Sequence, residues 1–302
     1  MQSCSTIIPN LLKLCGIVNS QNDSNHFIII DMEDGKDKSI YERKWDMYVN
    51  SITSIPSKEV DALKKGRIFE PENQNILDHL LKARIIGEVL CDDLGVMEGE
   101  KEDIISALTI HDALVLKEKA YIKRLKRSGK SANYENLQTV KKLIGENLRQ
   151  MGFSENVINL TDENITHEEG GPKHIGSMIV FIADAMLSGK EIMDVRTRVE
   201  MTRKGWRSDK NVYDQETADQ NIKYWKEFFI GAPGHGERSH DVVQLESANN
   251  VCRILTNKLK NIHPELVDNP KYSKIFGNDG DYNLLYLYIK DRVDEKLSTY
   301  TI

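Results

Sequence analysis

Ala107-Leu-Thr-Ile-His111-Asp112-Ala-Leu-Val115 is an apolar run that ends in an adjacent imidazole and carboxylate. Burying either polar group alone would be costly, so the pair predicts polar partners elsewhere in the chain. Imidazole nitrogen and carboxylate oxygen are also ligand types for divalent metal ions. The stretch therefore predicts a core helix that presents two metal-ligand types at its end.

Helical patterns flank this stretch on both sides. Apolar residues recur at helical spacing from Asn75 to Leu94, and Gly95 follows where a C-terminal cap is expected. Downstream, Ile175 to Leu187 is strongly apolar yet contains Asp184, a carboxylate that needs a partner. Further helices are predicted near residues 100–112, 136–151, 155–160, 216–229, 242–261 and 282–297.

The predicted fold class is all-α, with a small irregular or β-containing appendage over residues 1–70. Within that appendage, Phe27 to Asp31 is a short β-branched run, and Ser39 to Ile52 could form a short helix. A helical core is expected over residues 71–200. Residues 201–302 are expected to form a C-terminal helical extension packed on that core.

Composition limits the classes of function. The formal charge of −6 disfavours nucleic acid as a partner, and the sequence contains no run of eighteen apolar residues that would predict a membrane span. The four cysteines lack Cys-x-x-Cys spacing, which argues against a disulfide framework or a thiolate zinc site. A cytoplasmic protein is therefore expected, and a homo-oligomer stays open.

Four positions combine into one candidate site: His79, His111, Asp112 and Asp184. Mixed nitrogen and oxygen donors suit a transition metal or magnesium, and such sites leave coordination positions open for water or substrate. The segment around His235 and His240-Asp241 is rich in glycine, so we interpret it as a surface loop followed by a helix start, with Ser239 or Asp241 as the N-cap.

The sequence from about His79 to Asp184 resembles the HD-domain phosphohydrolase superfamily. The pattern is a histidine, then a His-Asp pair, then an aspartate in a later helix. Short local motifs also match this superfamily: Leu94-Gly95, Gly-Glu-x-x-Asp-Ile from Gly99 to Ile104, Ala-Leu-x-Ile-His-Asp, and Ile-Ala-Asp-Ala-Met from Ile182 to Met186.

The resemblance implies a helical HD-domain bundle in which His79, His111, Asp112 and Asp184 bind a divalent metal ion, with Mn, Mg, Co, Ni, Fe and Zn all left open. His167, in His167-Glu-Glu-Gly, stands 17 residues before Asp184, as a histidine does in HD hydrolases of dinucleoside polyphosphates. It could hold a second metal. The companion histidine of those enzymes is absent, because no histidine occurs from Ala113 to Thr166.

The function that the resemblance implies is hydrolysis of a phosphate ester or anhydride by a metal-activated water, with His111 and Asp112 as the catalytic pair. A nucleotide or a related small phosphorylated metabolite is the expected substrate. Basic segments follow the ligand helices, and Lys117 and Arg196 are the predicted phosphate contacts. Two alternatives stay open: a cyclic-nucleotide or dinucleotide phosphodiesterase, and a non-catalytic HD module that binds a nucleotide or a protein.

Overall fold

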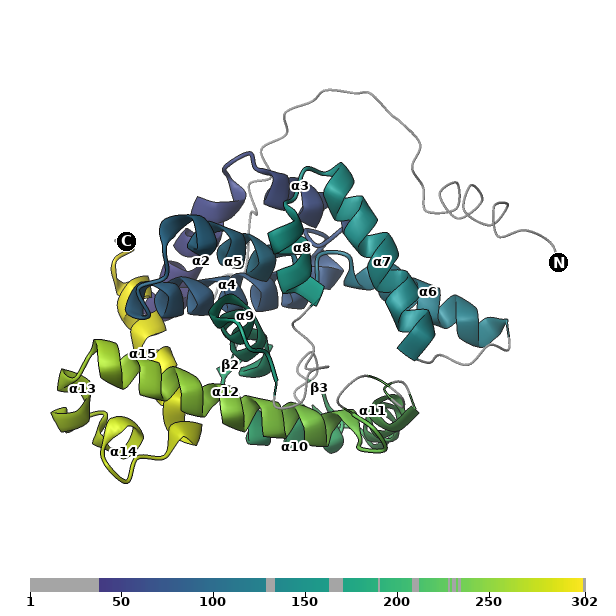
Figure 1. Cartoon of the computed structure of the whole chain (residues 1–302). Coiled ribbons are helices and arrows are strands. Elements are labelled where there is room, and N and C mark those ends of the chain that lie inside the picture. Colours follow the sequence, from purple (N-terminus) through teal and green to yellow (C-terminus); the bar gives the residue numbers. More distant parts are fainter. Residues whose placement is uncertain are drawn as a thin grey trace. The chain divides into compact units, whose positions relative to one another are not determined.

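The computed structural model describes residues 38–128, 134–162, 171–189, 191–207, 212–227, 229, 232 and 235–300 (Figure 1). The predicted strand at Phe27 to Asp31 lies outside the described residues. Lys38–Ile302 forms one compact unit, and the expected boundaries at residues 70 and 200 fall inside it. No helix of the described ranges presents an apolar stretch of the length that spans a bilayer.

The described chain is helical with two short antiparallel strand pairs, which confirms the predicted all-α class. The strand pairs are β1 (Leu187–Ser188) with β2 (Glu191–Ile192), and β3 (Trp206–Arg207) with β4 (Val212–Tyr213). The helices are α2 (Ile40–Thr53), α3 (Lys58–Lys65), α4 (Gln74–Asp93), α5 (Glu98–Ile110), α6 (Val115–Arg127), α7 (Tyr134–Gln150), α8 (Glu155–Asp162), α9 (Ile175–Ala185), α10 (Val195–Arg203), α11 (Gln215–Glu227), α12 (His240–Ile262), α13 (Glu265–Asp268), α14 (Ser273–Phe276) and α15 (Leu285–Ser298), with 3-10 turns η2 (Pro71–Asn73) and η3 (Tyr282–Leu284).

Three helices, α4, α5 and α9, pack against one another and form the centre of the core (Figure 1). Their apolar side chains are buried, as the helical spacing predicted, because each helix contacts neighbours on more than one face. Helix α4 ends at Asp93, within one residue of the predicted end, with Leu94 as its C-cap, and the following Gly95 adopts a positive φ of 62° that favours glycine. The predicted bounds of this helix are therefore confirmed.

Residues 38–70 form helices that join the core. Trp45 and Tyr48 of α2 and Leu63 of α3 are buried in the same apolar cluster as α4. Gly66 follows α3 and touches the chain just after the His-Asp pair, because a Cβ there would lie 1.7 Å from the Ala113 carbonyl oxygen. This part of the chain thus supports the turn that carries His111 and Asp112.

Candidate metal centre

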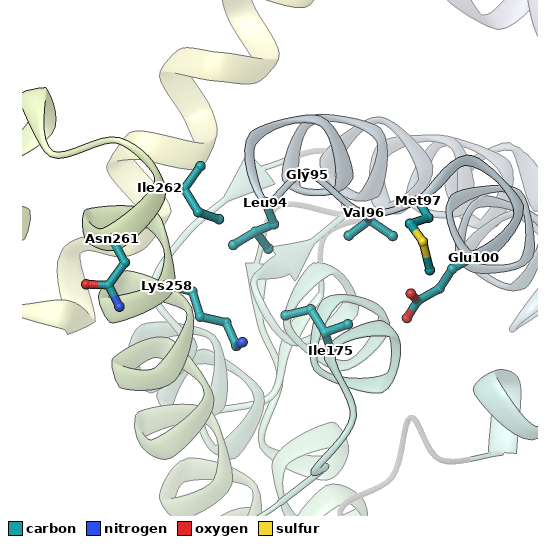
Figure 2. A pocket seen from close by; sticks show the side chains of 9 residues that line it. All are labelled: Leu94, Gly95, Val96, Met97, Glu100, Ile175, Lys258, Asn261 and Ile262. Atoms are coloured by element: carbon teal, nitrogen blue, oxygen red, sulfur yellow. The ribbon is translucent and has the colours of Figure 1, made fainter.

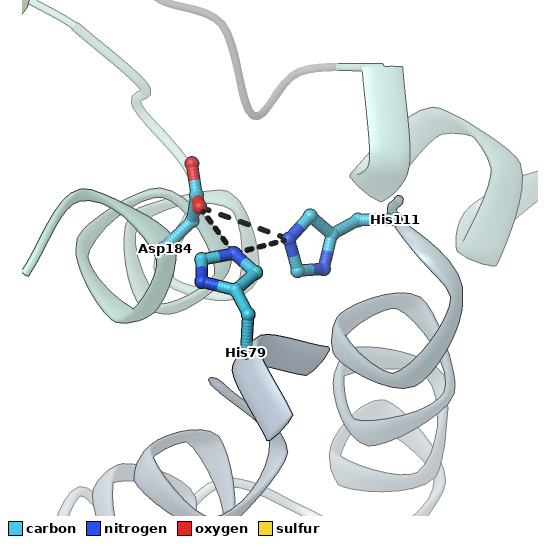
Figure 3. A group of neighbouring side chains, drawn as sticks. All are labelled: His79, His111 and Asp184. Carbon is cyan, nitrogen blue, oxygen red and sulfur yellow. Dashed lines mark hydrogen bonds and ion pairs between the residues drawn. The ribbon is translucent and has the colours of Figure 1, made fainter. Parts of the chain in front are cut away.

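Three side chains from three helices meet at one point: His79 of α4, His111 at the end of α5 and Asp184 of α9 (Figure 3). His79 Nε2 lies 3.0 Å from Asp184 Oδ1 and 3.4 Å from His111 Nε2. His111 Nε2 lies 3.7 Å from the same carboxylate oxygen. Among the described residues, this is the group of His, Cys, Asp or Glu side chains that could hold a metal ion.

A backbone contact orients the His111 ring. Its Nδ1–H donates to the Leu108 carbonyl oxygen at 2.9 Å, so Nε2 is the nitrogen that a cation would bind in place of a proton. Nε2 is the atom that points at His79 and Asp184 (Figure 3). A metal-binding histidine is commonly held in this way, with its second nitrogen donating to a carbonyl or carboxylate. The His111 side chain, 1% exposed, therefore presents the correct nitrogen to the site.

Electrostatics keep Asp184 ionised although it is buried. Burial raises the pKa of this carboxyl, but Arg198, His111 and His79 outweigh burial and hold the pKa well below its usual range. For His111, burial lowers the pKa, while the hydrogen bond to Asp184 and the charge of Asp112 raise it to about 9. An ionised carboxylate beside two imidazoles is a set of donors that fits a divalent cation.

Asp112 occupies the turn between α5 and α6, next to His111, and it is not a member of the three-residue group. It lies within electrostatic range of Glu118 on α6. Burial raises the pKa of the Glu118 carboxyl, Lys141 opposes this shift, and Asp112 adds to it. Burial, Glu118 and Asp112 likewise raise the pKa of Tyr224 on α11. The Asp112 side of the site is therefore acidic.

Two of the remaining predicted site residues, Lys117 and Arg196, lie on α6 and α10. Lys117 is half-buried in the first turn of α6, and Arg196 is exposed on α10. His167 lies outside the described residues. A further basic side chain, Arg198, approaches the ligands: its Nη2 lies 3.9 Å from Asp184 Oδ1. The sequence held a signal for it, because Val195 and Val199 define the buried face of α10 and Arg198 adjoins that face.

The prediction of a surface loop is wrong for His235, which is buried, whereas the predicted helix start is confirmed, because α12 begins at His240. His235 is 1% exposed, and its Nε2 lies 3.0 Å from His240 Nδ1, because both rings stack with Phe229. Ser239 is the N-cap position of α12, as predicted, whereas Asp241 is buried and accepts from Arg203 of α10 at 2.6 Å.

A separate pocket of about 370 Å³ lies where α4 ends and α5 and α9 begin, beside the end of α12 (Figure 2). The candidate ligands do not line it, because each of the three helices carries its ligand toward the opposite end. Its lining is mainly apolar, with three polar residues: Leu94, Gly95, Val96, Met97, Glu100, Ile175, Lys258, Asn261 and Ile262.

Comparisons of the chain with protein-family models, with curated proteins and with solved structures found no match.

Proposed function

We propose that this chain is an HD-type metal-dependent phosphohydrolase that acts on a nucleotide or a related small phosphorylated metabolite. The observation that carries the proposal is the meeting of His79 Nε2, His111 Nε2 and Asp184 Oδ1 at one point. In such a site a divalent cation supplies two things, a lowered pKa of water and neutralisation of charge on phosphoryl oxygens.

The chain's own residues have different roles around the candidate metal centre. His79, His111 and Asp184 would hold the cation, and the Leu108 carbonyl keeps His111 in the tautomer that binding requires. Asp112 stands beside His111 but outside the three-residue group. In this position its carboxylate would orient the attacking water and accept a proton from it. Its acidic neighbour Glu118 belongs to the same side of the site.

The test is metal analysis of the purified chain, followed by a phosphate-release screen over nucleotides and dinucleotides with Mn, Mg, Co, Ni and Fe(II). Fe(II) is included because two histidines and one carboxylate also form the ligand set of non-haem iron enzymes. We expect wild type to bind metal and release phosphate, and His79→Ala to lose both. His174→Ala is the matched control, because His174 is exposed at the start of α9.

The screen also separates the alternatives. A chain that binds metal and hydrolyses only diesters would be a phosphodiesterase. A chain that binds metal and nucleotide without releasing phosphate would be a binding module. If neither metal nor activity is found, or if His79→Ala behaves as wild type does, the proposal fails.

A further inference from the structure

Arg198 has a guanidinium group that the protein itself leaves without hydrogen bonds in the described ranges. Its side chain is only 24% exposed, and its one charged contact is Asp184 Oδ1, at 3.9 Å from Nη2. This separation is too long for a hydrogen bond. By contrast, Arg292 donates from Nε and Nη2 to the buried carboxylate of Asp93. A largely buried guanidinium normally makes hydrogen bonds, so the N–H groups of Arg198 indicate a bound ligand that accepts them.

Helix α10 holds Arg198 in place relative to the candidate ligands. The Asp194 side chain caps the helix by accepting from Thr197 N at 2.9 Å. At the other end, Arg203 pairs with Asp241 of α12, and Asn221 of α11 donates to the Thr202 carbonyl oxygen at 2.9 Å. These contacts at both ends, with Val195 and Val199 buried between them, limit movement of Arg198. A fixed guanidinium binds an anion at a smaller entropic cost.

Charge favours an anion at this position. With the chain alone, Asp184 Oδ1 lies 3.9 Å from Arg198 Nη2 and also faces the imidazoles of His79 and His111. A divalent cation on Asp184 would leave Arg198 beside a second positive charge at short range. An anion placed between the two groups removes that repulsion and satisfies the free N–H donors.

We propose that Arg198 binds the phosphate of the substrate, and that this phosphate is a terminal group. This inference rests on the proposed function and names the substrate class for the same site. A guanidinium takes two oxygens of one phosphate in a forked contact. A terminal phosphoryl group has three non-bridging oxygens, so one remains for the cation. A diester has two, so one of them would have to serve both the guanidinium and the cation.

The test measures binding of inorganic phosphate and of dimethyl phosphate to the metal-loaded full chain by calorimetry, without any turnover. We expect phosphate to bind more tightly than dimethyl phosphate. Arg198→Gln should weaken phosphate binding by at least about tenfold, and Arg198→Lys should weaken it less, because it keeps the charge but loses the fork. Arg43→Gln, at an exposed arginine of α2 far from the candidate ligands in sequence, should bind as wild type does. Melting temperature and metal content check the fold of each variant.

Two results would overturn the inference: equal phosphate affinity in Arg198→Gln and Arg43→Gln, or dimethyl phosphate binding as tightly as phosphate. Absence of phosphate binding to the metal-loaded wild type would overturn it as well. Arg198-dependent phosphate binding without hydrolysis of any substrate would contradict the proposed function and leave the anion site standing. Hydrolysis that is indifferent to Arg198→Gln would contradict the anion site alone.

Discussion

At the scale of single residues, Asp184 and Asp112 differ in what surrounds them. Asp184 lies within 3.0 Å of one imidazole and 3.7 Å of another, and its pKa is held well below its usual range. Asp112 follows His111 directly but lies outside the three-residue group. We therefore propose different tasks for the two carboxylates, cation binding for Asp184 and proton transfer for Asp112.

We predict that Asp184→Asn loses metal affinity by more than about tenfold. Removal of even a residue that only hydrogen-bonds to a metal ligand lowers metal affinity or activity by about 10–100-fold. Asp112→Asn should keep the metal and lose about 10²–10⁴-fold in turnover. Metal titration and phosphate release on the same preparations measure both effects. Equal loss of metal in the two variants would make Asp112 a ligand.

At the scale of elements, the turn after α5 depends on a glycine two helices earlier in the chain. A Cβ on Gly66 would lie 1.7 Å from the Ala113 carbonyl oxygen, which is backbone and cannot rotate away. Close packing of backbone on backbone at this point sets the position of the turn that begins at His111.

We therefore predict that Gly66→Ala costs at least about 1–3 kcal/mol of unfolding free energy, as overpacking does, and also weakens metal binding. The matched control is Gly99→Ala in the first turn of α5, where a Cβ would meet nothing within 4 Å. That variant should be neutral or gain up to about 0.5–1 kcal/mol. Denaturant titration measures both changes, and equal stability of the two variants would contradict the prediction.

The junction of α10 with α12 should respond to acid. Burial raises the pKa of Asp241, but hydrogen bonds from Ser239 and Arg203 outweigh it, so the pKa stays below its usual value. A carboxyl with a depressed pKa contributes stability above its unfolded pKa of about 3.9 and loses that contribution as the pH falls through the folded-state value.

Accordingly, Asp241→Asn should destabilise the protein more at neutral pH than near pH 3, about one pH unit below the unfolded pKa. Denaturant titrations of wild type and variant at both values measure the difference. A destabilisation that does not change with pH would show that the charge on Asp241 contributes nothing to the free energy of unfolding.

At the scale of the whole molecule, the C-terminal helix α15 is hydrogen-bonded to α4, the helix that carries His79. Asp93, at the end of α4, accepts from Tyr288 at 2.8 Å and from Arg292 Nη2 at 2.8 Å. Asp93 is buried, whereas the next residue toward the N-terminus, Asp92, is half exposed. The C-terminal extension thus helps to hold α4, and with it one metal ligand.

Removal of this buried carboxylate should be costly. Asp93→Ala leaves Arg292 and Tyr288 without their partner and should cost about 3–5 kcal/mol of unfolding free energy. Asp92→Ala, which removes an exposed pair with Lys101, should cost at most about 1 kcal/mol. Chemical denaturation measures both, and a cost for Asp93→Ala no greater than for Asp92→Ala would contradict the prediction.

The sequence by itself determined the helices and the residue types that meet at the candidate metal centre. Apolar periodicity placed α4, α5 and α9, because a buried helix face must repeat every three to four residues. The same sequence singled out His79, His111 and Asp184, since polar groups in apolar helices require partners. Their separation along the chain, however, says nothing about the angle at which three helices pack.

Tertiary structure alone decided which groups meet. Packing of α10 brought Arg198 rather than Arg196 toward Asp184, because residues two positions apart on a helix point to nearly opposite sides. The tertiary structure also left Asp112 outside the three-residue group, buried His235, and packed residues 38–70 on the core. These outcomes depend on contacts between segments far apart in sequence, which local propensity and spacing do not encode.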